Sequence, residues 1–310
     1  MIALLAPGQG SQTPGMLSPW LDDPLAEETV AAWSDAVGLD LRRLGTTAEA
    51  DEIKDTAVTQ PLVVATALLA AARLGAHVTL PERAPIAGHS VGELAAAAVA
   101  GVLPTDAAVA LAAVRGREMA AACALEPTGM SALLGGNPDD VLARLSELGL
   151  EPANMNGAGQ IVAAGPLSAL AALAENPPER SRVKALPVAG AFHTRFMAPA
   201  EDAVRTHAAG IEPADPERPL LSNADGTVVT SGAEALSRLV SQVTRPVRWD
   251  MCMATLRERE VTAVIELPPA GALVGLVKRE LKGTATLALK TPDDLDAAAA
   301  LVAEHAGAQA

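Results

Sequence analysis

A serine lies between two glycines in the stretch Gly88-His89-Ser90-Val91-Gly92-Glu93. This pattern fits the G-x-S-x-G elbow, which exposes a nucleophilic serine on a tight turn between a strand and a helix. Glycines suit the turn because a Cβ atom would clash there, and the helix N-terminus favours a developing oxyanion. Residues 84–87 can form the strand and residues 94–100 the helix. A capping box between Ser90 and Glu93 on an ordinary helix explains the same residues, so the motif alone leaves catalysis open.

Arg115 is a second candidate, because two predicted helices bring it back toward Ser90. The elbow helix runs for roughly ten residues, which is ~15 Å at ~1.5 Å per residue. After a short turn, the helix predicted over 105–122 can fold back antiparallel, and Arg115 lies about eleven residues along it. We therefore expect the guanidinium near the serine hydroxyl. A surface ion pair of Arg115 with Glu118 or Glu93 is the alternative interpretation.

The chain offers little for a metal or a phosphate. Its histidines form no H-x-x-x-H pair, and Cys123 and Cys252 have no metal-ligand spacing, so we expect no metal site. The glycine-rich loop at 7–15 lacks the G-K-[ST] of a phosphate loop, and Thr13 stands where a third glycine is needed. The alternative is that this loop brings backbone N–H groups and Gln9 close to a reacting centre.

The composition argues against several classes of partner. The net charge is −14 at pH 7, and aromatic residues make up 2% of the chain with no Tyr, which disfavours binding to nucleic acid or an anionic membrane. No apolar run reaches ~18 residues without a charge, and the N-terminus indicates a strand rather than a signal peptide. The two separated cysteines suit a reducing compartment. We expect a globular cytoplasmic protein that binds neither nucleic acid nor membranes.

The order of predicted elements indicates two structural units. Over 1–118 and 191–310, strands alternate with helices, which predicts a parallel sheet covered on both faces. Over 119–190 the order is β-α-β-β-α-β, which is the ferredoxin-like pattern. The sequence therefore predicts an α/β fold with a small subdomain inserted into a large one. Within the large subdomain, Thr59-Gln60-Pro61 looks like a helix start with proline in the first turn.

Further motifs follow one another along nearly the whole chain. In order, they are Pro7-Gly8-Gln9-Gly10-Ser11-Gln12, Thr59-Gln60-Pro61, the elbow at 88–93, Arg115-Gly116, Asn154-Met155-Asn156 with Gly159-Gln160, Phe192-His193, and Gln242-Val243-Thr244-Arg245-Pro246-Val247-Arg248-Trp249. Together they resemble the motifs of malonyl-CoA:acyl-carrier-protein transacylases, the acyltransferases of fatty-acid and polyketide synthesis. The resemblance implies an α/β-hydrolase-like large subdomain with a parallel sheet and an inserted ferredoxin-like small subdomain.

The resemblance also implies a role for each matching residue. These roles are Ser90 as the acyl-accepting nucleophile, His193 as its general base, Arg115 as the holder of the malonyl carboxylate, Gln9 and the Val91 N–H as the oxyanion hole, Gln242 as the residue whose backbone carbonyl orients the histidine, and Gln60 as a lining residue of the pocket. The implied reaction is ping-pong transfer of malonyl from coenzyme A to the phosphopantetheine thiol of acyl carrier protein. It needs no cofactor, since malonyl-CoA is a substrate.

Two departures from the family pattern stand out. The family's glycine-proline-glycine turn is replaced by Leu267-Pro268-Pro269-Ala270, and Gly190 stands where related polyketide acyltransferase domains have a histidine. The bulk of Phe192, together with Val91, favours malonyl over methylmalonyl, although one methyl group is worth only ~1–3 kcal/mol.

The acidic carrier protein implied by the resemblance would need a basic docking surface on this acidic chain. The candidates are Arg182, Lys184, Lys278, Arg279 and Lys282. Scattered surface charges explain the same residues equally simply.

Three other functions stay open. A serine esterase or thioesterase on this scaffold would have no use for Arg115 and would usually add an acid between the serine and the histidine. The acids in that interval that fit loosely, Asp139 and Asp140, fall in the predicted insert. A polyketide-dedicated acyltransferase for another extender unit is a second alternative. A non-catalytic scaffold for carrier proteins, in which Ser90 would be dispensable, is a third.

Overall fold

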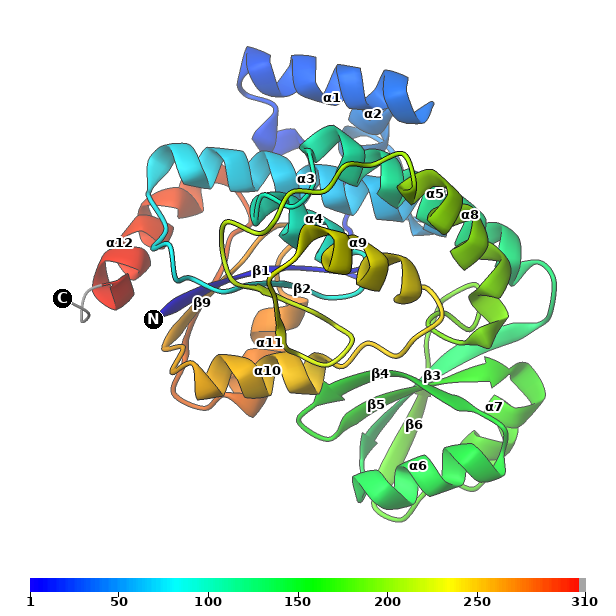
Figure 1. Cartoon of the computed structure of the whole chain (residues 1–310). Coiled ribbons are helices and arrows are strands. Elements are labelled where there is room, and N and C mark those ends of the chain that lie inside the picture. The colour runs from blue at the N-terminus through cyan, green and yellow to red at the C-terminus, as the bar shows by residue number, and fades with distance from the viewer. Residues whose placement is uncertain (307–310) are drawn as a thin grey trace.

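The computed structural model describes residues 1–306, which form two sheets in two subdomains (Figure 1). The larger sheet has the strand order β10-β9-β1-β2-β7-β8, in which only the β7–β8 pair is antiparallel. Its strands are β1 (Ile2–Ala6), β2 (Ile86–Gly88), β7 (Leu220–Leu221), β8 (Val228–Val229), β9 (Ala263–Glu266) and β10 (Ala285–Ala288). The prediction of a parallel sheet is therefore confirmed for all strands of this sheet except β8.

Both faces of the larger sheet are buried, and β1 shows how. Ile2, Leu4 and Ala6 belong to the main hydrophobic core, whereas Ala3 and Leu5 belong to a second core on the opposite face. Successive side chains of a strand point to opposite faces, so a strand that is apolar throughout needs helices on both sides. Helices α3, α4 and α5 cover one face, and α10 and α11 cover the other (Figure 1).

Helices make up most of the rest of the described chain. The α-helices are α1 (Pro24–Val37), α2 (Leu41–Thr46), α3 (Thr56–His77), α4 (Gly92–Val99), α5 (Thr105–Cys123), α6 (Pro138–Glu147), α7 (Leu167–Glu175), α8 (Ala198–Ala208), α9 (Gly232–Ser241), α10 (Trp249–Glu258), α11 (Ala272–Glu280) and α12 (Leu295–Ala306). Short 3₁₀ helices are η1 (Ser18–Trp20), η2 (Glu52–Lys54), η3 (Arg195–Met197) and η4 (Pro292–Asp294).

The start predicted for α3 is wrong. The helix begins at Thr56, because the side chain of Asp55 accepts a hydrogen bond from the Ala57 N–H at 2.8 Å and caps it. Pro61 therefore lies inside the helix rather than in its first turn. Surrounding core contacts outweigh the lost backbone hydrogen bond, since the residues that flank this proline are buried.

Helix α3 is also the one helix of residues 1–306 that is long and apolar enough to cross a membrane by length and composition. Of its most apolar window, 72% is buried inside the fold, and a core helix of a globular protein passes the same test. Its apolar character is accounted for by packing against α4 and α5.

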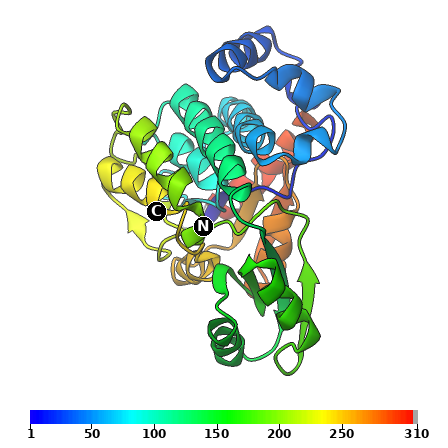
Figure 2. The same cartoon turned by 90° about the vertical axis from the view of Figure 1, so that its right-hand side faces the viewer.

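The smaller sheet has the strand order β4-β5-β3-β6 and is antiparallel at each pairing. Its strands are β3 (Thr128–Gly135), β4 (Glu151–Gly157), β5 (Gln160–Pro166) and β6 (Ser181–Ala185). With α6 and α7 they give the predicted β-α-β-β-α-β order and form a separate lobe (Figure 2). Leu133 and Ile161 face α6 and α7 in the lobe's own core, whereas Ala132 and Val162 join the main core and attach the lobe to the large subdomain.

The turn that departs from the family pattern follows β9. Glu266 is buried at the end of this strand, and its carboxylate accepts hydrogen bonds from the backbone N–H groups of Gly271, Leu273 and Val274 at 2.9, 3.0 and 2.9 Å. These groups begin α11, whose first turn would otherwise have unpaired donors. Glu266 therefore caps α11 across the altered turn.

Candidate active site

Ser90 lies on a sharp turn between β2 and α4, with a positive φ of 55°. A non-glycine residue in this region costs about 1–3 kcal/mol and persists only where its surroundings hold it. The flanking glycines are required for close approach, since a Cβ on Gly88 would lie 2.1 Å from the Gly92 carbonyl oxygen and a Cβ on Gly92 would lie 2.4 Å from that of Ala6. The capping-box alternative is wrong, because the N-cap of α4 is Val91 and no side chain caps the helix.

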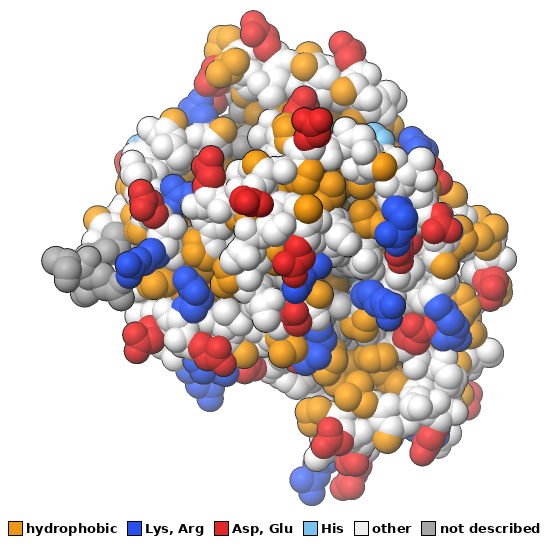
Figure 3. Space-filling view, in the orientation of Figure 1, with side chains coloured by type: hydrophobic (Ala, Val, Ile, Leu, Met, Phe, Trp, Pro, Cys, Tyr) orange, Lys and Arg blue, Asp and Glu red, His pale blue; other side chains and the backbone are white. Residues whose placement is uncertain are grey.

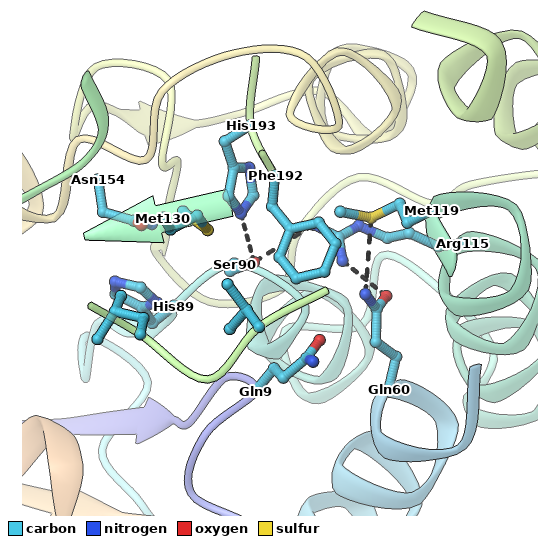
Figure 4. A pocket seen from close by; sticks show the side chains of 12 residues that line it. Gln9, Gln60, His89, Ser90, Arg115, Met119, Met130, Asn154, Phe192 and His193 are labelled. Carbon is cyan, nitrogen blue, oxygen red and sulfur yellow. Dashed lines mark hydrogen bonds between the residues drawn. The ribbon is translucent and has the colours of Figure 1, made fainter. Parts of the chain in front are cut away.

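His193 is within hydrogen-bond distance of the serine hydroxyl (Figure 4). Its Nε2 lies 2.7 Å from Ser90 Oγ, and its Nδ1 lies 2.7 Å from the backbone carbonyl oxygen of Gln242. A carbonyl can only accept, so Nδ1 carries the proton and Nε2 is left to accept one from the serine. The neutral imidazole is thus fixed in the tautomer that a general base requires.

Burial is the main cause that lowers the pKa of His193 to about 3, and the nearby charge of Arg115 adds to it. The hydrogen bond to the Gln242 carbonyl acts in the opposite direction but is weaker. The side chain is 4% exposed. His193 is therefore neutral throughout the physiological pH range.

Arg115 is brought to the serine by the antiparallel packing of α5 on α4. It is 2% exposed, and its Nη2 donates to Ser90 Oγ at 3.3 Å (Figure 4). Its other partners are the Oε1 atoms of Gln60 at 2.6 Å and Gln242 at 2.9 Å. Burial lowers the pKa of Arg115 to about 10, which still leaves the guanidinium charged at neutral pH. The predicted surface pair with Glu118 is wrong, since that carboxylate binds another arginine, Arg117.

The side chain of Gln242 has contacts that sequence reasoning missed. While its backbone carbonyl accepts from His193, its side-chain Oε1 accepts from Arg115. Its Nε2 donates to the Ser90 carbonyl oxygen at 3.1 Å and also to a carboxylate oxygen of Glu93. One residue therefore connects the histidine, the guanidinium and the elbow.

Asn223, which follows β7, was also missed. Its Oδ1 accepts from the Ser90 N–H at 2.8 Å, and its Nδ2 donates to the Gly88 carbonyl oxygen at 2.7 Å. Its own N–H donates to Glu93 at 2.9 Å. Asn223 therefore bonds both arms of the elbow. The sequence signal was a polar residue at the end of the apolar run that begins at Leu220, at the sheet edge where parallel strands end.

The pocket beside Ser90 has a volume of about 100 Å³. Its lining residues are Gln9, Gln60, His89, Ser90, Arg115, Met119, Met130, Asn154, Leu186, Val188, Phe192 and His193. The predicted residues Gln9, Gln60 and Phe192 thus lie in the wall, and the Phe192 ring extends across the pocket in front of the serine (Figure 4). The Gln9 side chain donates to Thr56 Oγ1 at 3.1 Å. Val91, directly after Ser90, is buried.

Both subdomains contribute to this pocket. Met130 lies on β3 and Asn154 on β4 of the small sheet, opposite the residues of the elbow. His89 joins the two parts, since its Nε2 lies 2.9 Å from the Asn156 Oδ1 on β4. The ring of His89 also packs edge-on against Trp249, with centroids 5.5 Å apart. The motif Asn154-Met155-Asn156 marked the insert in the sequence without a role, and the tertiary fold shows that Asn154 lines the pocket and Asn156 contacts His89.

The predicted basic residues do not form one continuous patch. Arg182 and Lys184 lie on β6, at one edge of the small sheet. Lys278 and Arg279 lie near the end of α11, with Lys282 just beyond it, and α11 contacts β4 at the opposite edge. Figure 3 shows Lys and Arg side chains scattered among Asp and Glu on the face it presents. Within residues 1–306, no group of three or more His, Cys, Asp and Glu side chains could hold a metal ion.

A serine hydroxyl beside a histidine and a buried guanidinium, held together in an α/β fold, is an arrangement that can carry out acyl transfer. The family model described as the acyl transferase domain matches residues 4–304, so this chain belongs to the acyl transferase family. It is 63% identical over 297 residues to the malonyl CoA-acyl carrier protein transacylase of Mycobacterium tuberculosis H37Rv, covering 96% of this chain and 98% of that protein. The protein of the same name from Escherichia coli K12 is 35% identical over 304 residues, covering 96% and 98%.

Solved structures agree with this assignment. A crystal structure of the Mycobacterium tuberculosis enzyme called MCAT has a TM-score of 0.93 and 62% identity, and the match covers 96% of this chain and 99% of that one. A malonyl-transacylase in complex with its type II PKS acyl-carrier protein has a TM-score of 0.90 and 29% identity, with 97% and 99% covered. The α/β fold with its separate antiparallel subdomain is therefore that of known transacylases.

Proposed function

We propose that this chain transfers a malonyl group from coenzyme A to the phosphopantetheine thiol of an acyl carrier protein, in fatty-acid or polyketide synthesis. The observation that carries this proposal is a buried guanidinium, Arg115, 3.3 Å from a serine hydroxyl that is itself 2.7 Å from a histidine. A thioester carbonyl and a free carboxylate are the two groups that such a site can bind together. Relatives at 63% and 35% identity named malonyl CoA-acyl carrier protein transacylase support the same substrate.

The mechanism follows from the hydrogen bonds between Ser90, His193 and Gln242. Ser90 attacks the thioester carbonyl while His193 Nε2 takes its proton, and the imidazolium returns a proton to the departing thiolate. The Val91 N–H and Gln9 stabilise the tetrahedral oxyanion. Losing one such donor typically costs about 2.7–4 kcal/mol of transition-state stabilisation. The carrier-protein thiol then attacks the malonyl-serine ester by the reverse route.

Arg115 and the Phe192 ring select the acyl group. The planar guanidinium can make two parallel charge-assisted hydrogen bonds to the malonyl carboxylate. Gln60 holds the guanidinium from one side by a 2.6 Å hydrogen bond. The Phe192 ring narrows the pocket where an α-methyl branch would lie. Malonyl is therefore the acyl group that suits the space and charge of the site.

The reaction requires no cofactor, because the serine and histidine supply the nucleophile and the base. We place the protein in the cytoplasm, where coenzyme A thioesters and carrier proteins are found. We also propose that residues 119–190 form one structural unit and residues 1–118 and 191–310 the other, of which 307–310 lie outside the described residues. The four strands of the small sheet, which lie between Thr128 and Ala185, support this division, although α5 continues across position 119 to Cys123.

The carrier protein would dock beside the pocket mouth, using one of the two basic groups. Charge reversal of Lys278 and Arg279 should raise the KM for carrier protein without changing that for malonyl-CoA. The same reversal of Arg182 and Lys184 on the other edge is the matched comparison. An unchanged KM for carrier protein in both double variants would remove the basic docking surface from the proposal.

The central test is intact mass after mixing with malonyl-CoA, followed by peptide mapping. We expect a malonyl adduct on Ser90 that disappears when holo carrier protein is added and that Ser90→Ala never forms. Arg115→Ala should lower malonyl loading sharply and acetyl loading less. Free malonate appearing at the same rate with and without carrier protein would indicate a hydrolase, and unchanged transfer by Ser90→Ala would indicate a scaffold.

A further inference from the structure

Arg115 is a buried charge whose immediate partners are neutral. Its hydrogen bonds go to two amide oxygens and one hydroxyl, and within residues 1–306 no carboxylate forms an ion pair with it. An isolated buried charge is expensive, so buried charges are normally compensated nearby. The malonyl carboxylate supplies the compensation when the site is loaded. The empty enzyme needs another source of negative charge.

The side-chain amide of Gln242 points to that source. Its Oε1 faces the Arg115 guanidinium, which can only donate. Its Nε2 faces three acceptors, which are the Ser90 carbonyl oxygen, the Asn223 Oδ1 at 3.2 Å and a carboxylate oxygen of Glu93. The partners on each side leave one orientation for this amide. Its dipole therefore links the positive charge of Arg115 to the carboxylate of Glu93.

Glu93 is built into the first turn of α4, directly behind the nucleophile. It is 3% exposed, and its two carboxylate oxygens accept from the Asn223 N–H and from Gln242. Burial raises its pKa to about 7, while its hydrogen bonds and the charge of Arg115 oppose the rise. Glu93 is thus a buried carboxyl whose ionisation depends on an uncompensated Arg115.

Two other ionisable groups near Glu93, Cys252 and His193, are neutral and so cannot supply the positive charge that favours its ionised form. Cys252 of α10 interacts with it, but burial raises the pKa of this thiol well above its usual range, so the thiol is neutral. His193, reached through Gln242, is neutral because its pKa is lowered to about 3. Among the described residues, Arg115 of α5 is therefore the charged group that acts on the Glu93 carboxyl.

We propose that Glu93 is the counter-ion of Arg115 in the empty enzyme, coupled to it through the amide of Gln242, and that it takes up a proton when an acyl carboxylate binds Arg115. The inference rests on the proposed function, since it requires an acyl group that carries a carboxylate. One buried positive charge is then balanced by one negative charge in each state. Glu93 acts through Arg115 and Gln242 and touches no reacting atom, so it is a positioning residue.

The counter-ion role of Glu93 can be measured as the number of protons taken up when the enzyme is acylated. Transfer of an acyl group from the thioester to Ser90 replaces the hydroxyl proton with the acyl group and releases coenzyme A as a thiol. No net proton is consumed, and the released thiol, with an ordinary pKa near ~8.5, is the same for every acyl group. Loading a malonyl group additionally draws a proton from solvent to Glu93, because the malonyl carboxylate now pairs with Arg115. Acetyl has no carboxylate and should draw none.

The experiment compares proton uptake on loading of malonyl-CoA and acetyl-CoA. A pH indicator in weak buffer reports the protons, and intact mass on the same samples reports the acylated fraction. At pH about 8 we expect malonyl loading to take up as much as about one proton more per acylated serine than acetyl loading. At pH about 5.5 the difference should vanish, since Glu93 is already protonated in both states.

Kinetics give a second readout. Because uptake of the proton accompanies loading, kcat/KM for malonyl relative to acetyl should fall by up to about tenfold per pH unit above pH about 7. Glu93→Gln should abolish both this fall and the extra proton. Glu118→Gln, which alters an acid on the exposed side of α5, is the matched control and should retain both.

Each outcome separates this inference from the proposed function. Absence of malonyl loading in the wild-type enzyme would refute the proposed function. Malonyl loading with the same proton count as acetyl at pH about 8 would refute the counter-ion role alone, and that comparison needs no variant. Retention of the extra proton by Glu93→Gln would also overturn it. Should Glu93→Gln fail to fold, the wild-type comparison at pH about 8 and about 5.5 still decides the inference.

Discussion

Asn223→Ala is the substitution whose effect follows most directly from the elbow. The asparagine side chain bonds the Ser90 N–H and the Gly88 carbonyl at 2.8 and 2.7 Å. Truncation leaves both backbone groups without these partners, and each unsatisfied buried group costs about 1–3 kcal/mol. Ser90 borders the pocket, where water can replace one bond. We therefore expect the free energy of unfolding to fall by about 2–4 kcal/mol.

The same substitution should slow acylation. The φ of 55° at Ser90 is held partly by the hydrogen bond from its N–H to Asn223. With that bond gone, relaxation of about 1–3 kcal/mol of strain moves the hydroxyl away from His193. A loss of 1.4–2.7 kcal/mol corresponds to about 10- to 100-fold in the acylation rate. The assays are urea unfolding and the rate of malonyl-adduct formation by intact mass.

The control is Asn176→Ala, which truncates an exposed asparagine at the end of α7. It should change stability by less than about 0.5 kcal/mol and leave acylation unchanged. Asn223→Asp is informative as well, because it keeps the acceptor for the Ser90 N–H but loses the donor to Gly88. A stability loss below about 1 kcal/mol for Asn223→Ala, together with a normal acylation rate, would refute the idea that this side chain holds the elbow.

Three further predictions concern the pocket and the base. Phe192→Ala should improve methylmalonyl relative to malonyl loading by about 10- to 200-fold, measured by competition and intact mass; an unchanged ratio would remove the ring from selectivity. Gln60→Ala leaves Arg115 without its 2.6 Å partner, so kcat/KM for malonyl-CoA should fall about tenfold with little change for acetyl-CoA, whereas equal losses would contradict this. Since the pKa of His193 is lowered to about 3, acetyl loading should show no acid limb near pH 6.5. The unfolded histidine binds a proton below about 6.5 and the folded one does not, so stability should fall as the pH drops from about 6.5 toward 3; denaturant midpoints that do not change over this window would contradict it.

The sequence allowed the fold and the principal side chains to be predicted because their signals are local. A glycine-flanked serine, a β-α-β-β-α-β order and two helices of known rise required no tertiary contact to recognise. The placement of Arg115 at the serine follows from helix geometry alone. The start of α3 was mispredicted because Asp55 caps the helix ahead of the proline that seemed to begin it.

The polar groups behind Ser90 could not be predicted in the same way. Glu93 bonds to Asn223, which lies 130 positions away, and to Gln242, which lies 149 positions away. No local feature of the sequence marks these residues as partners. Spacing offered a capping box with Ser90 as the alternative interpretation of Glu93, whereas in the fold Glu93 is buried and bonds to Asn223 and Gln242. Buried polar residues choose partners by tertiary satisfaction of hydrogen bonds, which sequence spacing does not encode.

The position of β1 has a consequence for how the chain folds during synthesis. This first strand lies inside the sheet and pairs with β2 on one side, but its other partner is β9, where Ile2 meets Ala263. A ribosome releases that partner only when most of the chain has been made. Until then one edge of an entirely apolar strand has no neighbour, and an unpaired apolar edge of this kind favours aggregation of the growing chain. Folding of the large subdomain should therefore be a late event, and nascent chains that end before β9 should remain sensitive to protease.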